Sequence, residues 1–125
     1  MNLVLGAGGL IAIDRDDRRV AGLIELGRRA GASLVTSAPV VSQAWRDGSR
    51  QARLARWLPM VNVRAVALHE ARAAGELLAT SGTSDAVDAL LALETVPGDQ
   101  LLTSDPSDLR TLIAHRGIAV SVVLV

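Results

Sequence analysis

Two pairs of aspartates are the side chains of this sequence best placed to do chemistry. Asp85 and Asp88 open an apolar helical run, and Asp105 and Asp108 stand where a short apolar strand ends and another helix begins. Residues three apart share one face of a helix, so each pair can direct two carboxylates at one point. Two carboxylates about 5 Å apart repel by roughly 3 kcal/mol at an effective dielectric constant of about 20. A hard cation such as Mg²⁺ or Mn²⁺ would offset that repulsion, so the spacing predicts a divalent-metal site if the two pairs meet.

Helix capping offers a second interpretation of the same aspartates. Asp85 precedes the apolar run, and Asp105 precedes Pro106, which favours the first position of a helix. Acids in a first turn also interact favourably with the helix dipole. Capping accounts for Asp85 and Asp105 but only partly for Asp88 and Asp108, so both interpretations stand at this point.

The composition indicates a single domain over residues 1–125 with an aliphatic core. Half of the residues are apolar, but the only aromatic ones are two Trp, so Leu, Val, Ile and Ala have to fill the interior. Thirteen basic residues, all Arg, balance thirteen acids, so any nucleic-acid contact has to be a local patch. The absence of Cys excludes disulfides, thiolate chemistry and cysteine zinc sites.

Nothing in the sequence indicates a targeting or membrane segment. The N-terminus lacks a charged region followed by a long apolar stretch, and no run of about 18 apolar residues occurs. We therefore expect a cytoplasmic protein without a membrane partner.

Short apolar runs alternate with helical patterns along the whole chain. Strands are expected at 2–5, 34–36, 61–68, 101–103 and 118–125, with helices at 18–30, 39–46, 49–58, 69–80, 84–96 and 106–115. The glycine-rich stretch 6–9 is expected to form a tight turn. This alternation predicts an α/β fold, a small parallel β-sheet flanked by helices on both faces. Ligands of such sheets gather at the carboxyl ends of the strands, where Gly6 and Asp105 are expected to lie.

Three segments resemble those of a known family. They are Asp-Ala-Leu-Leu-Ala at 88–92, Thr-Ser-Asp-Pro-Ser-Asp-Leu at 103–109 and Leu-Val-Leu-Gly-Ala-Gly-Gly-Leu-Ile-Ala at 3–12. Together they make the whole chain similar to the PIN-domain ribonucleases, especially the short VapC-type toxins of bacterial toxin–antitoxin pairs.

The resemblance implies a fold, a chemistry and a set of partners. It implies a PIN-like three-layer sandwich with an acidic pocket that binds Mg²⁺ or Mn²⁺, where the metal activates a water that cleaves RNA phosphodiesters. It also implies an RNA substrate, a cognate antitoxin and a homodimer. Asp88 and Asp105 would be the catalytic and metal-binding residues, with Asp108 and Asp85 as further metal ligands.

Two positions depart from the family pattern. The family has Asp at the end of the first strand, where this chain has Gly6, and Glu in the helix after the second strand, where it has Gln43. The chain would then be a degenerate member that keeps the fold and a binding role. Alternatively, it is active with a weaker or differently placed ion held by Asp85 or Asp14, or it is a nuclease silenced by an introduced Gly6. The two independent departures favour the degenerate member.

Two functions therefore remain open from the sequence, a Mg²⁺- or Mn²⁺-dependent endoribonuclease and a PIN-like binding module that cuts nothing. Arg46, Arg50 and Arg53 lie three or four residues apart and could contact RNA phosphates or a partner, although a solvated face accounts for them as well. A dinucleotide-binding reading of the stretch 6–9 is disfavoured, because Ile11 stands where the fingerprint needs Gly or Ala.

Overall fold

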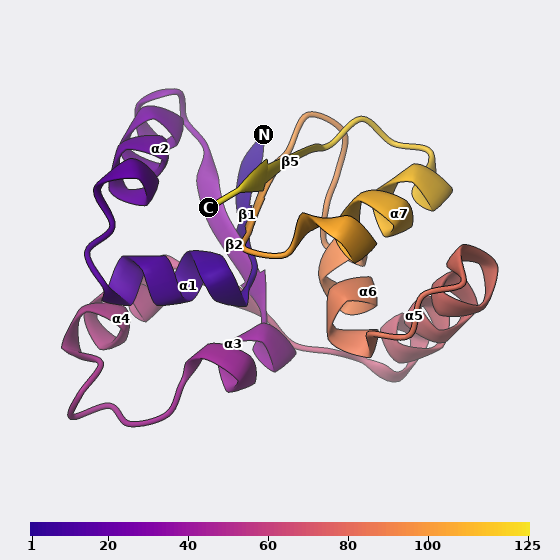
Figure 1. Cartoon of the computed structure of the whole chain (residues 1–125), viewed down its shortest axis with the longest axis horizontal. Helices are drawn as coiled ribbons and strands as arrows, with labels where there is room; N and C mark the ends of the chain where they lie inside the picture. Colours follow the sequence, from indigo (N-terminus) through magenta and orange to yellow (C-terminus); the bar gives the residue numbers. More distant parts are fainter.

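Five short segments form one all-parallel sheet in the computed structural model, which describes all 125 residues (Figure 1). The strands are β1 (Asn2–Leu5), β2 (Ser33–Ser37), β3 (Asn62–Arg64), β4 (Gln100–Thr103) and β5 (Ser121–Leu124), in the order β3-β2-β1-β4-β5. The central strands β1 and β4 are covered on both faces, which is why they read as continuous apolar runs. The strand order reverses between β1 and β4, and this is where open α/β sheets place their ligands.

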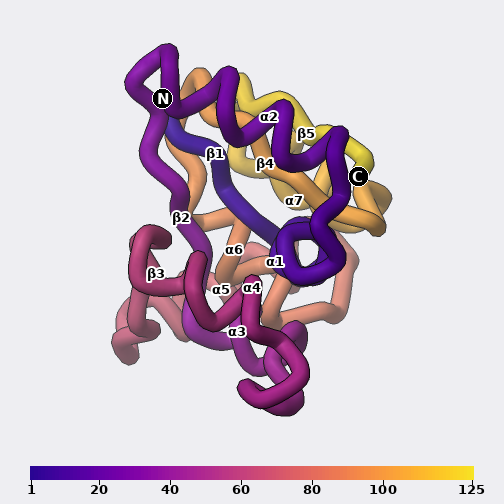
Figure 2. The backbone as a smooth tube through the Cα atoms, turned by 90° about the vertical axis from the view of Figure 1, so that its left-hand side faces the viewer, coloured from indigo at the N-terminus to yellow at the C-terminus, as the bar shows by residue number.

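Seven helices cover the two faces of the sheet. They are α1 (Ala7–Asp14), α2 (Arg18–Arg29), α3 (Ala38–Ala44), α4 (Ala52–Trp57), α5 (Leu68–Ser81), α6 (Ala86–Leu93) and α7 (Pro106–Arg116), with a 3-10 turn η1 (Leu58–Met60). In Figure 1, α1, α2 and α4 lie on one side of the sheet and α5, α6 and α7 on the other. Figure 2 looks onto the first of these layers. The predicted α/β sandwich is confirmed.

The core is aliphatic, as the composition predicts. Leu, Val, Ile and Ala fill the interior, and Trp45 and Trp57 pack at its margin, each partly buried. Helix α2 packs on the core through Val20, Ile24 and Gly27, which are all buried, and through the partly buried Leu23. None of the helices combines the length and apolar character that crossing a membrane requires.

The expected tight turn at residues 6–9 is wrong, because helix α1 begins directly after β1. Gly6 is the N-cap of α1, and its amide donates to the carbonyl of Leu102 at 2.9 Å. The glycines allow the start of α1 to approach the end of β4 closely. A Cβ on Gly8 would lie 2.7 Å from the amide nitrogen of Ser104. Here the small residues allow a helix to start against the end of β4.

The expected strand over 61–68 is also wrong in extent. Only β3 is extended, all three of its residues are exposed, and Leu68 already belongs to α5. β3 is the edge strand and pairs with β2 alone, so the apolar run does not have to continue as a strand beyond these three residues. The expected helix at 49–58 starts later, at Ala52, because Ser49 donates to the carboxylate of Asp47 rather than capping a helix.

Candidate functional site

The carboxyl ends of β1 and β4 open into one pocket of about 180 Å³. Gly6 follows β1 directly, and Asp105 follows β4 after one intervening residue. Helix α3 contributes Gln43, and the start of α6 contributes Asp85 and Asp88. The pocket therefore lies at the reversal of strand order, the sheet edge predicted from the sequence.

Asp88 lies among the other predicted acids. Burial, the largest cause, raises the pKa of Asp88 to about 6, and the neighbouring charges of Asp85, Asp108 and Asp105 raise it further in that order. The two aspartate pairs are therefore close enough for their charges to act on Asp88. Asp108 acts on Asp88 through its charge but does not line the pocket.

The capping interpretation is confirmed for Asp85 and only in part for Asp105. The Oδ1 of Asp85 accepts the backbone N–H of Asp88 at 3.0 Å, which fixes the start of α6. Asp105 occupies the N-cap position of α7, but its side chain makes no capping hydrogen bond. Its backbone N–H instead donates to the hydroxyl of Thr103 at 3.1 Å, so the Asp105 carboxylate stays available to the pocket.

The acids around this pocket fall short of a metal-binding set. Asp85, Asp88 and Asp105 line it, yet no group of three or more His, Asp or Glu side chains is arranged to hold an ion. At the two altered positions, Gly6 offers only backbone and Gln43 a neutral amide. The residues that the resemblance names as metal ligands are not gathered around one point in this structure, and their binding of a divalent cation stays a prediction.

The altered position at Gly6 can accept a side chain. Its φ of −79° and ψ of 178° are ordinary extended backbone, which any residue adopts. A Cβ there would lie 3.2 Å from the carbonyl oxygen of Leu102, a contact that a shift of a few tenths of an ångström relieves. Asp14 does not replace the missing acid, because it lies outside the pocket and accepts the N–H of Leu54 at 3.3 Å.

The remaining walls of the pocket are made by residues that were not predicted from the sequence. Val40, Leu91 and Leu109 make an apolar side, and Ser104 packs against α1. Ser37, at the end of β2, does not line the pocket, and its hydroxyl is fully buried without a hydrogen-bond partner. The sequence could have indicated Ser37 by its position, because a polar residue that ends a buried parallel strand lies at this edge of the sheet.

The three arginines proposed for RNA or partner contact are absent from the pocket lining. Arg46 donates to the carbonyls of Ser42 and Trp45, while Arg50 and Arg53 lie on the exposed surface. Their contact with RNA or a partner stays a prediction.

Comparison with known proteins identifies the fold. No protein-family model matches the sequence, and no curated protein matches it. Among solved structures, the chain is similar to one of VapBC2 from Rickettsia felis, whose structure was determined bound to a DNA fragment from the promoter. The two share 16% sequence identity with a TM-score of 0.69, over 98% of this chain and 99% of that chain. At this identity the similarity shows the fold alone, and the chain has a PIN/VapC-like fold.

Proposed function

We propose that this chain acts by binding a partner of the antitoxin type and that divalent-metal RNA cleavage is weak or lost. One observation carries the proposal: the pocket where the resemblance puts a metal site has Gly6 and Gln43 at two acidic positions, and no three-ligand group. The VapBC2 structure with the similar fold supports a partner of this kind. Self-association is part of the same proposal.

One observation favours the endoribonuclease as a second candidate. Burial raises the pKa of Asp88 most, and the charges of three nearby aspartates raise it further, so part of the shift reflects a negative potential at this point. A cation near Asp88 and Asp105, with Asp85 and Asp108 close by, would relieve that potential. Acting as a Lewis acid, Mg²⁺ or Mn²⁺ would stabilise charge on a scissile phosphate.

Co-expression tests the binding function directly. Where a reading frame next to this one encodes a small DNA-binding protein, that protein is the partner to use. We expect the two chains to elute as one complex in size-exclusion chromatography, with light scattering reporting the number of copies of each. A chain that elutes alone, with such a neighbour present in excess, contradicts the proposal.

An RNA cleavage assay separates the two candidates. The protein, its Gly6→Asp/Gln43→Glu variant and its Asp88→Asn variant are incubated with mixed RNA and Mn²⁺. Cleavage by the double variant alone identifies a fold with a disabled pocket, as proposed. Cleavage by the unaltered protein that disappears in Asp88→Asn establishes the enzyme instead. If neither the unaltered protein nor the double variant cleaves RNA, the pocket is not an RNA-cleaving site.

Thermal unfolding gives the same variants a readout that needs no substrate. Two added carboxylates increase repulsion in the metal-free pocket, so we expect Gly6→Asp/Gln43→Glu to melt at a lower temperature than the unaltered protein. Mn²⁺ should then raise the Tm of the double variant more, because it binds the folded state more tightly. Equal Tm values and equal responses to Mn²⁺ would mean that the two positions do not share one site.

A further inference from the structure

Strand β5 forms an open edge of the sheet, because it is the last strand in the order and pairs with β4 alone. The amide of Ser121 donates to the carbonyl of Asp99 at 3.0 Å, and the amide of Val125 donates to a carbonyl of β4 at 2.8 Å. Successive residues of a strand direct their backbone groups to opposite sides. Val122 and Leu124, which alternate with these donors, therefore direct their N–H and C=O groups away from β4.

Most of these outward backbone groups have no partner within the chain. The carbonyl of Leu124 has one, because the Arg19 guanidinium donates to it at 2.6 Å. The N–H of Leu124 and both backbone groups of Val122 have none. An unpaired donor and acceptor along a strand edge template the addition of another strand. The open part of this edge is therefore centred on Val122.

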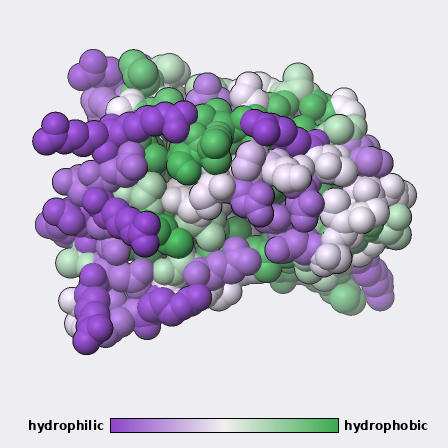
Figure 3. Space-filling view, in the orientation of Figure 1, coloured by the Kyte–Doolittle hydropathy of each residue, from purple (hydrophilic) through white to green (hydrophobic).

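The side chains of this edge are mostly apolar, and none is charged. From Gly117 to Val125 the chain contains no Asp, Glu, Lys or Arg, and Leu124 is 52% exposed. In Figure 3, hydrophobic side chains gather where Figure 1 places β5 and the C-terminus. Proteins usually protect an edge strand by keeping it very short or by placing charges on it. The β5 edge therefore has the character of an interaction surface.

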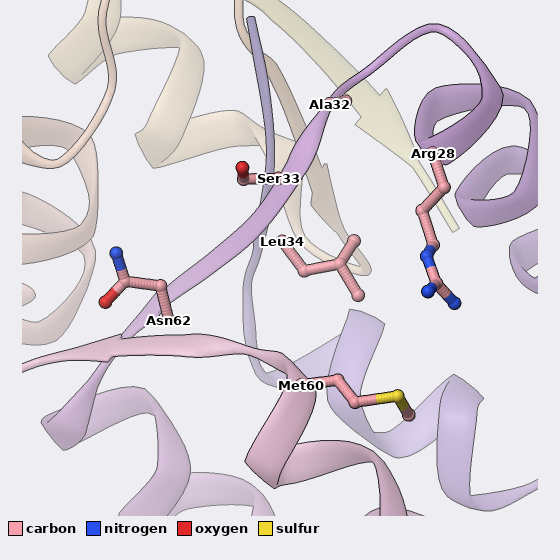
Figure 4. A pocket seen from close by; sticks show the side chains of 6 residues that line it. All are labelled: Arg28, Ala32, Ser33, Leu34, Met60 and Asn62. Atoms are coloured by element: carbon pink, nitrogen blue, oxygen red, sulfur yellow. The ribbon is translucent and has the colours of Figure 1, made fainter.

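The opposite edge of the sheet is protected in the usual way. β3 has only three residues, and Arg64 at its end forms an ion pair with Glu94 at 3.4 Å. A cavity of about 240 Å³ lies beside the start of β3, where Figure 4 shows the polar side chain of Asn62. The sheet can therefore be extended by a further strand at β5 rather than at β3.

We propose that two copies of this chain associate through β5, in antiparallel orientation, with the twofold axis between the two Val122 residues. In this register each Val122 exchanges two N–H···O=C bonds with its counterpart, and Leu124 lies opposite Val120 of the other copy. The two sheets then form one continuous sheet. The proposal rests on the self-association included in the proposed function, and it assigns the surface for it.

A second copy is a better occupant of this edge than an unrelated segment of chain. The twofold register supplies the outward donors with acceptors from the same three residues, and it places apolar side chains opposite apolar ones. Antiparallel association also puts the start of one α7, which carries Asp108, at the same end of the joined sheet as the end of the other α7, which carries His115 and Arg116. The charges of the two copies are therefore complementary there.

Sedimentation of the chain alone over a range of concentrations tests the interface. We expect a monomer–dimer equilibrium, and Leu124→Lys should raise its Kd about tenfold or more, because it removes an apolar contact and places a charge on the edge. Leu26→Lys is the matched control, since Leu26 is 68% exposed on α2, and it should dimerise as the unaltered protein does. Thermal unfolding at low concentration checks that both variants are folded.

Single cysteines test the register, because the chain has none of its own and any disulfide must join two copies. Val122→Cys should form a covalent dimer under mild oxidation, since the two Cα atoms of a directly opposed pair lie about 5.5 Å apart. Leu124→Cys should not, because its two copies are offset along the strands by roughly 13 Å. An equimolar mixture of Val120→Cys and Leu124→Cys should form a mixed dimer.

Three results would overturn the proposal. They are a chain that is monomeric at every concentration tested, a dimer that Leu124→Lys leaves unchanged, and a disulfide in Leu124→Cys alone but not in Val122→Cys. A Leu124→Lys variant that still forms the complex with the antitoxin-type partner separates this surface from partner binding. A monomeric chain whose partner complex is weakened by Leu124→Lys would instead assign β5 to that partner.

Discussion

At the scale of single residues, the environment of Asp88 makes the stability of the protein depend on pH. Its pKa is raised to about 6 by burial first and then by Asp85, Asp108 and Asp105, against an ordinary value of 3.8. At about pH 3 and below, the carboxyl is largely protonated in both states and costs almost no stability. As the pH rises toward 6, the unfolded chain is already ionised while the folded chain still holds the proton, so the free energy of unfolding falls.

We therefore predict that Asp88→Asn stabilises the protein near neutral pH. Two pKa units correspond to about 3 kcal/mol, and solvent screening of this half-buried group reduces the expected gain to about 1 kcal/mol. Urea unfolding should show this gain at pH 7.5 and almost none at pH 3. The control is Asp16→Asn, at an exposed residue with a φ of 56° that Asn also adopts. An equal effect of Asp88→Asn at both pH values would contradict the raised pKa.

Ser37 supplies a second prediction at the residue scale. Its hydroxyl is fully buried without a partner, whereas the adjacent Thr36 donates to the carbonyl of Leu5 at 2.6 Å. Removing an unsatisfied buried hydroxyl recovers its desolvation cost, so Ser37→Ala should stabilise the protein by about 1 kcal/mol. Thr36→Val should destabilise it by a similar amount, because it removes the hydrogen bond that the carbonyl of Leu5 accepts. Chemical denaturation measures both, and a destabilised Ser37→Ala would show that the hydroxyl has a partner.

At the scale of elements, the acidic pocket depends on the close contact between the start of α1 and the end of β4. A Cβ on Gly8 would lie 2.6 Å from the Cβ of Ser104 and 2.7 Å from its amide nitrogen, so the backbone has to move. Gly8→Ala should therefore cost about 1–3 kcal/mol of stability and shift the amide resonances of Ser104 and Asp105.

A glycine without such a contact makes the matched control. Gly22 lies inside α2, and a Cβ there meets nothing within 4 Å. Gly22→Ala should stabilise the protein by about 0.5–1 kcal/mol, because Ala restricts the unfolded chain and favours the helix. If Gly8→Ala behaved like Gly22→Ala, the tight junction between α1 and β4 would be refuted.

At the scale of the whole molecule, the net charge is zero but the charged residues are unevenly distributed. Residues 1–60 hold nine of the thirteen arginines and five of the thirteen acids, and residues 61–125 hold four and eight. The first group forms the layer of α1 to α4, and the second forms the layer of α5 to α7. Figure 3 shows strongly hydrophilic side chains projecting over the α2, α3 and α4 side. A polyanion should therefore approach that layer, with the acidic pocket at its border.

We also predict that RNA binds through this basic layer. Arg50→Gln/Arg53→Gln should weaken binding of a short single-stranded RNA about three- to tenfold and lower the salt slope by about 1. Fluorescence anisotropy between about 50 and 200 mM NaCl measures both quantities. Arg72→Gln, in α5 of the opposite layer, should change neither. Unchanged affinity in the double variant would remove RNA contact by these arginines.

Local patterns in the sequence by themselves determined the fold class, the central strands and the main helices. The buried runs of β1 and β4 and the amphipathic face of α2 are properties of consecutive residues. The pairing of Asp85 with Asp88, and the position of Asp105 after a strand, are local in the same sense.

The tertiary structure alone decided what those local features build together. The order β3-β2-β1-β4-β5 places the end of β1 beside the end of β4, and so brings Gly6 next to Asp105 across almost one hundred residues. It also decided that Gly6 starts a helix rather than a turn, and that this helix lies so close to Ser104 that only a small residue fits at position 8. Each of these features depends on packing between segments that are distant in the sequence. Such contacts produce no periodic pattern of residues, so local patterns cannot predict them.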